Sequence, residues 1–168
     1  MMTEKIKILD HKQLKQKMNR LSWQVYENNI NEKNIVIVGI SSRGTILAKE
    51  LMKMIKKISN INVILGRIDL DKKNPYDKTA NIDLSESDYK NKVVILCDDV
   101  LNSGKTLIYS SKIFLSTPLK KLSTVVLVNR DHNLYPIKSD YVGISLSTTL
   151  KEYVNVDLTT TNKGVYLS

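Results

Sequence analysis

The sequence predicts an α/β fold with a mostly parallel central sheet and helices on both faces. Short, continuous apolar runs bounded by turn residues recur along the chain, and such runs are typical of strands that are buried on both faces of a parallel sheet. Segments with apolar residues at helical spacing separate these runs. Strands that alternate with helices in this way form parallel sheets.

The predicted strands share a short apolar core with polar or glycine flanks. In chain order they are Ile35–Val38, Val63–Leu70, Val93–Cys97, Leu122–Val128, Tyr141–Ile144, Tyr153–Val156 and Gly164–Leu167. The stretch Asp71–Asp88 is polar, contains Pro75 and has few apolar residues.

Helices are predicted between the strands. The first begins after Asp10, a suitable N-cap with Gln13 at the capping-box position, and ends near Asn28. The second begins near Thr45 and the third follows Thr106. Helical spacing predicts that the following apolar residues face the core: Leu14, Met18, Leu21, Val25, Ile46, Leu47, Leu51, Met54, Ile55, Ile58, Leu107, Ile108, Ile113, Phe114 and Leu115.

Length and composition predict a single domain over residues 1–168, with 42% hydrophobic and 26% charged residues. No apolar run approaches the roughly 20 residues that span a bilayer, so no membrane segment is expected. The N-terminus lacks the apolar region of a signal peptide, and the single cysteine, Cys97, fits a reducing compartment. We therefore expect a cytoplasmic protein.

The net charge of +9 leaves two interpretations open. Lysines supply most of the positive charge and are scattered along the chain, which is typical of a solvated surface that also attracts phosphorylated ligands. The second interpretation is a surface that binds RNA. The sequence has short lysine pairs but no dense basic tract that would favour it.

The segment Val93–Thr106, VVILCDDVLNSGKT, carries the clearest chemical pattern. Its apolar strand delivers Asp98 and Asp99 to the carboxyl edge of the sheet, where ligands bind in α/β folds. The loop Asn102–Thr106 then enters a helix, and a glycine-containing loop at a helix N-terminus offers backbone N–H groups to a phosphate. A ribose 5-phosphate, with hydroxyls near the carboxylates and its phosphate in the loop, has the expected shape.

A P-loop, the triphosphate-binding motif of many NTPases, is the competing interpretation of Gly104, Lys105 and Thr106. That motif requires a glycine five positions before the Gly-Lys pair, and the residue at this position is Asp99. Because a carboxylate repels a triphosphate, a P-loop is excluded.

The same segment resembles the binding motif for phosphoribosyl pyrophosphate (PRPP) of the type I phosphoribosyltransferases, in which an apolar strand and two acidic residues precede a Thr/Ser-Gly-x-Thr turn. Ile35–Leu51 resembles the strand, pyrophosphate loop and helix of that fold. Val125–Gly143 is similar to the base-covering region of the pyrimidine operon attenuator proteins that double as uracil phosphoribosyltransferases. The resemblance spans the chain and implies a three-layer fold with a small hood over the base.

The resemblance implies an enzyme that joins a nucleobase, uracil, to PRPP and releases pyrophosphate to give a nucleoside 5′-monophosphate. Asp98 and Asp99 match the acids that bind the ribose hydroxyls, and Arg43 is expected to meet the pyrophosphate. Mg²⁺ is expected to bind through PRPP oxygens, because the sequence has no His/Cys ligand cluster. The remaining PRPP-binding residues implied by the match are Ser41, Ser42, Gly44, Asn102, Ser103, Gly104, Lys105 and Thr106.

A mobile loop closes over PRPP in this family, and Asp71–Asp83 is the candidate. Its residues expected to reach the pyrophosphate are Lys72, Lys73, Tyr76 and Lys78. The chain departs from the family in this loop, which is short and lacks an arginine. It also departs in the pyrophosphate loop, where two serines stand in place of a basic residue, and at Asn129–His132, where the family has Asp-Arg-Gly-His.

The alternative function is a regulator that senses PRPP or UMP, binds RNA and has little catalysis. A polar residue of the first helix contacts RNA in the attenuator family, and Trp23 stands at that position beside Arg20, with Lys138 and Lys151 adding charge. Tryptophan stacks on bases of single-stranded RNA, but it also packs against a core or a subunit partner. A homodimer or larger homo-oligomer is expected, because dimers are common among such small folds.

Overall fold

The central sheet of this protein, in a computed structural model that describes residues 5–76, 80–161 and 163–168, has six strands in the order β4-β3-β2-β5-β6-β7. The strands are β2 (Asn34–Ile40), β3 (Asn62–Asp69), β4 (Asn81–Ile82), β5 (Val93–Leu101), β6 (Lys121–Asn129) and β7 (Tyr141–Ser145). All neighbouring pairs are parallel except the edge pair of β3 and β4. The predicted, mostly parallel sheet is thus confirmed.

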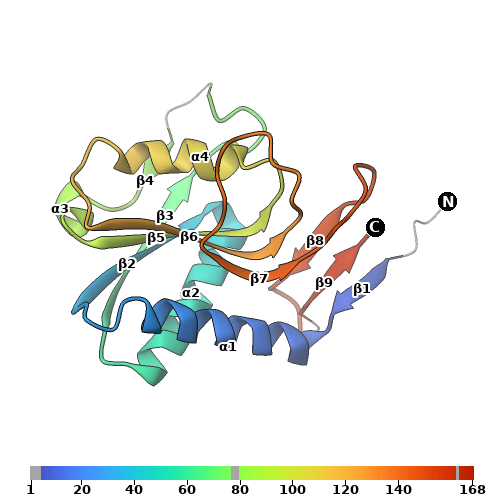
Figure 1. The fold of residues 1–168 in the computed structure, drawn as a ribbon, viewed down its shortest axis with the longest axis horizontal. Coiled ribbons are helices and arrows are strands. Elements are labelled where there is room, and N and C mark those ends of the chain that lie inside the picture. Colours follow the sequence, from blue (N-terminus) through green and yellow to red (C-terminus); the bar gives the residue numbers. More distant parts are fainter. Residues whose placement is uncertain (1–4, 77–79, 162) are drawn as a thin grey trace.

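Helices cover both faces of this sheet, as predicted (Figure 1). One face is covered by α1 (His11–Glu27) and α2 (Ser41–Ile58). The other face is covered by α3 (Glu86–Tyr89), α4 (Lys105–Ser111) and a 3-10 turn over Lys112–Phe114. Within the described residues, none of these helices is long and apolar enough to cross a membrane.

Alternate side chains of the central strands pack against these two helical layers, because successive side chains of a strand point to opposite faces. In β2, Ile35 and Ile37 pack with α1 and α2, whereas Val36 and Val38 pack on the side of α3 and α4. All four are fully buried. This double burial explains why the strand appears in the sequence as a continuous apolar run.

Helix α1 has the predicted start and the predicted inner face. Asp10 Oδ1 accepts a hydrogen bond from Gln13 N at 2.8 Å, and Gln13 Oε1 accepts one from Asp10 N at 3.0 Å. The helix is also tied to the edge of the sheet, because Arg20 Nη2 donates to the carbonyl oxygens of Val142 and Gly143 at 2.8 and 2.7 Å. The predicted stripe is buried in full: Leu14, Met18, Leu21 and Val25.

A second, antiparallel sheet lies beside the central one (Figure 1) and consists of β1 (Ile6–Leu9), β9 (Gly164–Leu167) and β8 (Val154–Asp157), in that order. We call these three strands the hood. The sequence analysis predicted β8 and β9 but not β1. Lysine and isoleucine alternate over residues 5–8, and this alternation is the strand signal that the prediction missed.

Two element boundaries differ from the prediction near the carboxyl edge of the sheet. Helix α2 begins at Ser41 rather than near Thr45. Strand β5 continues through Leu101, because its ladder with β6 extends to the pair of Leu101 and Asn129. The two acidic residues, Asp98 and Asp99, therefore belong to the strand itself.

One further expectation, on the α4 side, was wrong. Leu115 does not face the core and is 74% exposed, because α4 ends at Ser111 and the following 3-10 turn ends at Phe114. The polar stretch between β3 and β5 contains the short elements β4 and α3. In α3, Tyr89 is buried and packs edge-on against Phe114 at a ring distance of 5.0 Å.

Candidate functional site

A cleft lies where the carboxyl ends of β2 and β5 meet. The chain passes from β2 to β3 on one side and returns to β5 on the other side of β2, so the connections leave these adjacent strands in opposite directions. Ligands bind at such a switch point in open α/β sheets. The cleft has a volume of about 500 Å³ and is lined by Ser41, Ser42, Arg43, Lys72, Asp98, Asp99, Val100, Asn102, Thr106, Arg130, Tyr153 and Val154.

Two adjacent carboxylates in β5 line this cleft. Asp98 is 1% exposed and Asp99 is 4% exposed, and the backbone N–H of Asp99 donates to Asp98 Oδ1 at 3.0 Å. Burial and, to a lesser extent, the neighbouring charge of Asp99 raise the pKa of Asp98 to about 7, against the opposing effect of Lys72. Two nearly buried acids of this kind form a strong site for hydroxyl donors or cations.

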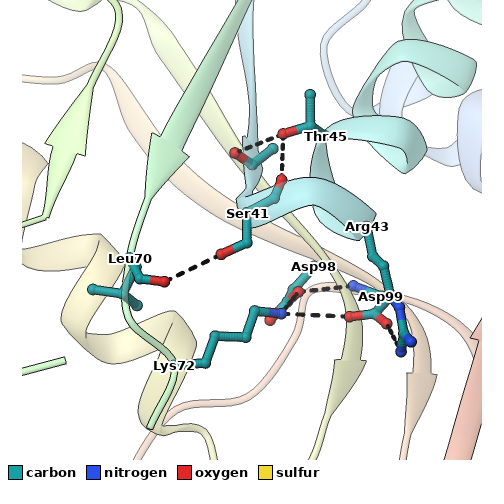
Figure 2. Close-up of polar contacts among 8 residues, drawn as sticks. Ser41, Arg43, Thr45, Leu70, Lys72, Asp98 and Asp99 are labelled. Atoms are coloured by element: carbon teal, nitrogen blue, oxygen red, sulfur yellow. Dashed lines mark hydrogen bonds and ion pairs between the residues drawn. The ribbon is translucent and has the colours of Figure 1, made fainter. Parts of the chain in front are cut away.

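Two cations from different elements contact these carboxylates (Figure 2). Lys72 Nζ lies 2.8 Å from Asp98 Oδ1 and 3.6 Å from Asp99 Oδ1. Arg43 Nη1, from the first turn of α2, lies 3.5 Å from Asp99 Oδ2. Burial disfavours the charged lysine, but the two carboxylates outweigh it and raise the pKa of Lys72.

The first turn of α2 is pressed against β5. A Cβ atom on Gly44 would lie 2.4 Å from the carbonyl oxygen of Cys97, so only glycine allows this approach. Ser41 has a φ of 55°, an unusual value for a residue other than glycine, and the Thr45 hydroxyl donates to its carbonyl oxygen. This packing brings Arg43 next to the carboxylates.

The loop over residues 102–106 forms a second, smaller cavity beside the cleft. Its volume is about 190 Å³, and Asp98 and Thr106 line both cavities. Gly104 adopts a left-handed φ of 83°, and a Cβ atom there would lie 2.7 Å from Ile137 Cγ2. The Ser103 hydroxyl accepts a hydrogen bond from the backbone N–H of Lys105 at 3.3 Å. Backbone and hydroxyl groups of this loop are thus arranged around a space suited to one phosphate.

Arg130 connects the end of β6 with the segment that leads into β8. Its side chain is buried, and its guanidinium donates to Thr148 Oγ1 at 3.0 Å and to the carbonyl oxygens of Thr149 and Glu152 at 3.1 and 2.6 Å. Its backbone N–H donates to the carbonyl oxygen of Leu101 at 2.9 Å. Arg130 therefore holds the segment that precedes β8 against the strand that carries the two acids.

Tyr153 follows this segment and lines the cleft with its neighbour Val154. Its side chain is 69% exposed, while its backbone exchanges two hydrogen bonds with Ser168 at 2.7 and 3.0 Å. An exposed aromatic ring on a fixed backbone, at the edge of a polar cleft, provides a surface on which a planar ring can stack.

The structure brings most of the residues predicted from the sequence to this place. Those that line the cleft are Ser41, Ser42, Arg43, Asp98, Asp99, Asn102 and Thr106, and those that line the smaller cavity beside it include Ser103, Gly104 and Lys105. Gly44 contributes through its contact with β5. Among the described residues of the predicted mobile loop, Lys72 lines the cleft; Lys78 lies outside the described residues.

The sequence analysis did not identify Val100, Arg130, Tyr153 and Val154 as cleft residues. In the sequence, Arg130 belongs to the segment Asn129–His132, which departs from the family pattern but does not indicate a cleft residue. Tyr153 is the first residue of the predicted strand Tyr153–Val156, and its sequence context indicates a strand and nothing more. Arg130 directly follows β6 at the carboxyl edge of the central sheet, and Tyr153 follows the segment that the Arg130 side chain binds.

The two carboxylates, Asp98 and Asp99, are also the candidate protein ligands for the expected Mg²⁺ ion. In the part of the chain that the structure describes, no group of three or more His, Cys, Asp and Glu side chains could hold a metal. Mg²⁺ prefers oxygen ligands in octahedral geometry and usually keeps several waters. Asp98 and Asp99 therefore fit an ion that takes most of its ligands from a substrate and water, and they do not form a protein-only site.

Other residues singled out from the sequence lie away from the cleft or carry no reactive group. Cys97 is buried in β5, and burial raises the pKa of its thiol, so it behaves as an apolar core residue. Trp23 is 42% exposed on α1 and contacts Tyr26 edge-on at 5.9 Å, so it is not part of the core. RNA binding by this face stays a prediction.

The family model and the related sequences place this chain in the same protein family. Residues 6–159 match the phosphoribosyl transferase domain family. The bifunctional protein PyrR of Pediococcus pentosaceus is 32% identical over 89% of each chain, and that of Clostridioides difficile is 34% identical over 94% of this chain and 93% of the relative.

Solved structures show the same fold at lower identity. The hypoxanthine-guanine phosphoribosyltransferase of Bacillus anthracis superposes with a TM-score of 0.76 and 20% identity over 96% of both chains. The hypoxanthine phosphoribosyltransferase of Staphylococcus aureus has a TM-score of 0.72 and 21% identity, covering 89% of this chain and 80% of that one. At this level of identity the likeness concerns the fold.

Proposed function

This chain belongs to the phosphoribosyltransferase family, and from that premise we propose that it transfers the 5-phosphoribosyl group of PRPP to uracil, forming UMP and releasing pyrophosphate. One observation carries the proposal: Asp98 and Asp99 lie nearly buried at a switch-point cleft, with a separate loop cavity beside them. A ribose 5-phosphate has hydroxyls that suit the two acids and a phosphate that suits the neighbouring loop cavity.

The proposed position of PRPP follows from the charges around the cleft. The ribose hydroxyls donate to Asp98 and Asp99, and the 5-phosphate lies in the loop over residues 102–106, among backbone N–H groups and the hydroxyls of Ser103 and Thr106. The pyrophosphate lies toward the first turn of α2, where Ser41, Ser42 and Arg43 line the cleft. The half-exposed guanidinium of Arg43 supplies positive charge there.

The proposed reaction is a substitution at the anomeric carbon. The bond from this carbon to the pyrophosphate oxygen breaks, a bond to a ring nitrogen of the base forms, and the proton of that nitrogen leaves to solvent. Positive charge that develops on the ribose ring is stabilised by Asp98 and Asp99, and negative charge on the departing pyrophosphate by Arg43. Mg²⁺, when bound, supplies further positive charge beside the leaving group.

The base is placed against the hood. Val100 from β5, Tyr153 just before β8 and Val154 at the start of β8 give this end of the cleft its apolar and aromatic surface. Uracil is the proposed base because the relatives are bifunctional PyrR proteins and because the sequence resembles the uracil-using attenuator family. Arg130 supports this wall through its hydrogen bonds to the preceding segment.

Replacing Tyr153 with alanine is expected to raise the KM for uracil about tenfold, because stacking of a base on an aromatic ring contributes roughly 1–3 kcal/mol. The KM for PRPP should change much less, since Tyr153 lies at the base end of the cleft. Steady-state kinetics with each substrate varied in turn measures the split. Leu150→Ala is the matched control, because Leu150 is 85% exposed and precedes Tyr153 in the same segment. Equal changes in the two KM values would contradict the assignment.

The first test of the function is the Mg²⁺-dependent formation of UMP and pyrophosphate from PRPP and uracil by the purified protein. Product establishes both the reaction and the base. Product with another base, and none with uracil, would correct the substrate alone. If PRPP binds but no base reacts, the second candidate is favoured, a nucleotide-sensing RNA-binding regulator with little catalysis. Absence of PRPP binding would refute the proposed site.

A further inference from the structure

The segment 71–76, which follows β3, contacts the proposed PRPP site at two separate places; we call it the strap. Its first contact is Lys72, whose ammonium lies 2.8 Å from Asp98 Oδ1 and 3.6 Å from Asp99 Oδ1 (Figure 2). Its own turn is fixed by Asp71, whose Oδ1 accepts hydrogen bonds from the backbone N–H groups of Lys73 and Asn74 at 2.9 and 3.3 Å. Lys72 is therefore presented on an ordered turn.

The second contact comes from the phosphate side. Lys105, in the loop over residues 102–106, donates from its ammonium to the carbonyl oxygen of Lys73 at 3.0 Å. The same ammonium lies 5.1 Å from the centroid of the Tyr76 ring, within the range of a cation–π interaction. The strap is thus attached both to the carboxylates of the ribose subsite and to the loop of the 5-phosphate subsite.

The two carboxylates depend on a cation at this position. Adjacent, nearly buried charges of the same sign destabilise each other unless a counter-ion compensates them. Arg43 contacts only Asp99, at 3.5 Å, and its side chain is 52% exposed. Lys72 contacts both acids, makes the shorter contact and is the less exposed cation at 38%. Lys72 is therefore their principal counter-ion.

We propose that Lys72 is an internal competitor of the substrate: its ammonium and the hydroxyls of the sugar use the same oxygen atoms of Asp98 and Asp99, so the strap must leave the acids for a phosphorylated sugar to bind. This inference rests on the proposed function and adds a regulatory step to it. Lys105 links the two subsites, because a phosphate in the 102–106 loop attracts the ammonium that fastens the strap. Release at the phosphate side and release at the ribose side thus favour each other.

Ribose 5-phosphate is the probe that isolates this competition, because it carries the hydroxyls and the phosphate but no pyrophosphate. In calorimetric titrations at pH 8, Lys72→Met is expected to bind it about tenfold more tightly than the unmodified protein, since a competing ion pair has been removed. The matched control is Lys73→Met, which removes the same charge from the neighbouring position on the strap without touching the carboxylates. The control should weaken binding slightly, because it lowers the positive potential of the cleft.

Hydrogen exchange of the unmodified protein tests the same idea without relying on the folding of a variant. Saturating ribose 5-phosphate should speed amide exchange in residues 71–76, because the strap loses both attachments. Slower exchange there would overturn the inference, as would equal affinities of Lys72→Met and Lys73→Met. Failure of ribose 5-phosphate to bind any of the folded proteins would instead overturn the proposed function, so the two failures are distinguishable.

Discussion

Replacing Asp99 with asparagine is expected to lower kcat/KM for PRPP about 100-fold or more while the protein stays folded. Asp99 is nearly buried at the cleft and is contacted by Arg43 and Lys72. A hydrogen bond from a ribose hydroxyl to an ionised acceptor contributes roughly 1.5–3 kcal/mol. Asparagine keeps the shape of the side chain but removes the charge that stabilises the positive ribose ring in the transition state.

Steady-state kinetics of PRPP consumption measures this loss, and circular dichroism confirms the fold. The control is Asp69→Asn, because Asp69 is an exposed carboxylate at the carboxyl end of β3, two strands away from β5 in the sheet, where it pairs with Arg67. That variant should retain the activity of the unmodified protein. Unchanged activity in Asp99→Asn would refute the assignment of the ribose subsite.

The second large effect concerns stability and comes from Asp98. Its pKa is about 7 in the folded protein, mainly because the carboxyl is buried, against about 3.9 in an unfolded chain. At pH values between these two pKa values, the carboxyl of Asp98 is therefore protonated in the folded state and ionised in the unfolded state. Protonation of Asp98 stabilises the fold fully below about pH 4, and this contribution is lost as the pH rises through about 7.

Asp98→Asn removes this dependence, because the amide is neutral at every pH. Relative to the unmodified protein, the free energy of unfolding of the variant should increase by about 2–3 kcal/mol between pH 5 and pH 8. Urea unfolding at the two pH values measures the difference. The same variant should be inactive, so the carboxylate that serves the substrate is one that weakens the fold.

Asp157 provides a control of opposite sign. Hydrogen bonds, first from the backbone N–H of Thr159 and then from Thr160, lower the pKa of Asp157 to about 2. Its stabilising effect is present above its unfolded pKa and is lost as the pH falls toward 2, so Asp157→Asn should destabilise the protein at pH 8. A stability difference for Asp98→Asn that does not vary with pH would contradict the burial of a titrating carboxyl at this position.

The sequence by itself determined the layers of this fold and the edge at which the site lies. Runs such as Ile35–Val38 are apolar at every position, and a strand with this composition is stable only when both of its faces are covered. The pattern from Asp98 to Thr106 combines the end of such a strand with a glycine turn and a helix start. These signals lie within a few neighbouring residues, so they can be identified without knowing the rest of the structure.

Only the tertiary structure decided what completes the cleft. Strand β1 pairs with β9 at the other end of the chain. Tyr153 lines the cleft beside Arg130, whose side chain binds the segment that leads into β8. The sequence predicts that Lys72, with its neighbours in the loop, reaches the pyrophosphate, whereas the tertiary structure places its ammonium on the two acids.

The physical reason for this division is the range over which each kind of information acts. Periodicity, capping and turn chemistry are set by neighbours along the chain. Counter-ions and cavity walls depend on which distant surfaces pack together. The acids of β5 could be recognised from the sequence, whereas the cation that compensates them and the ring beside them were decided by packing.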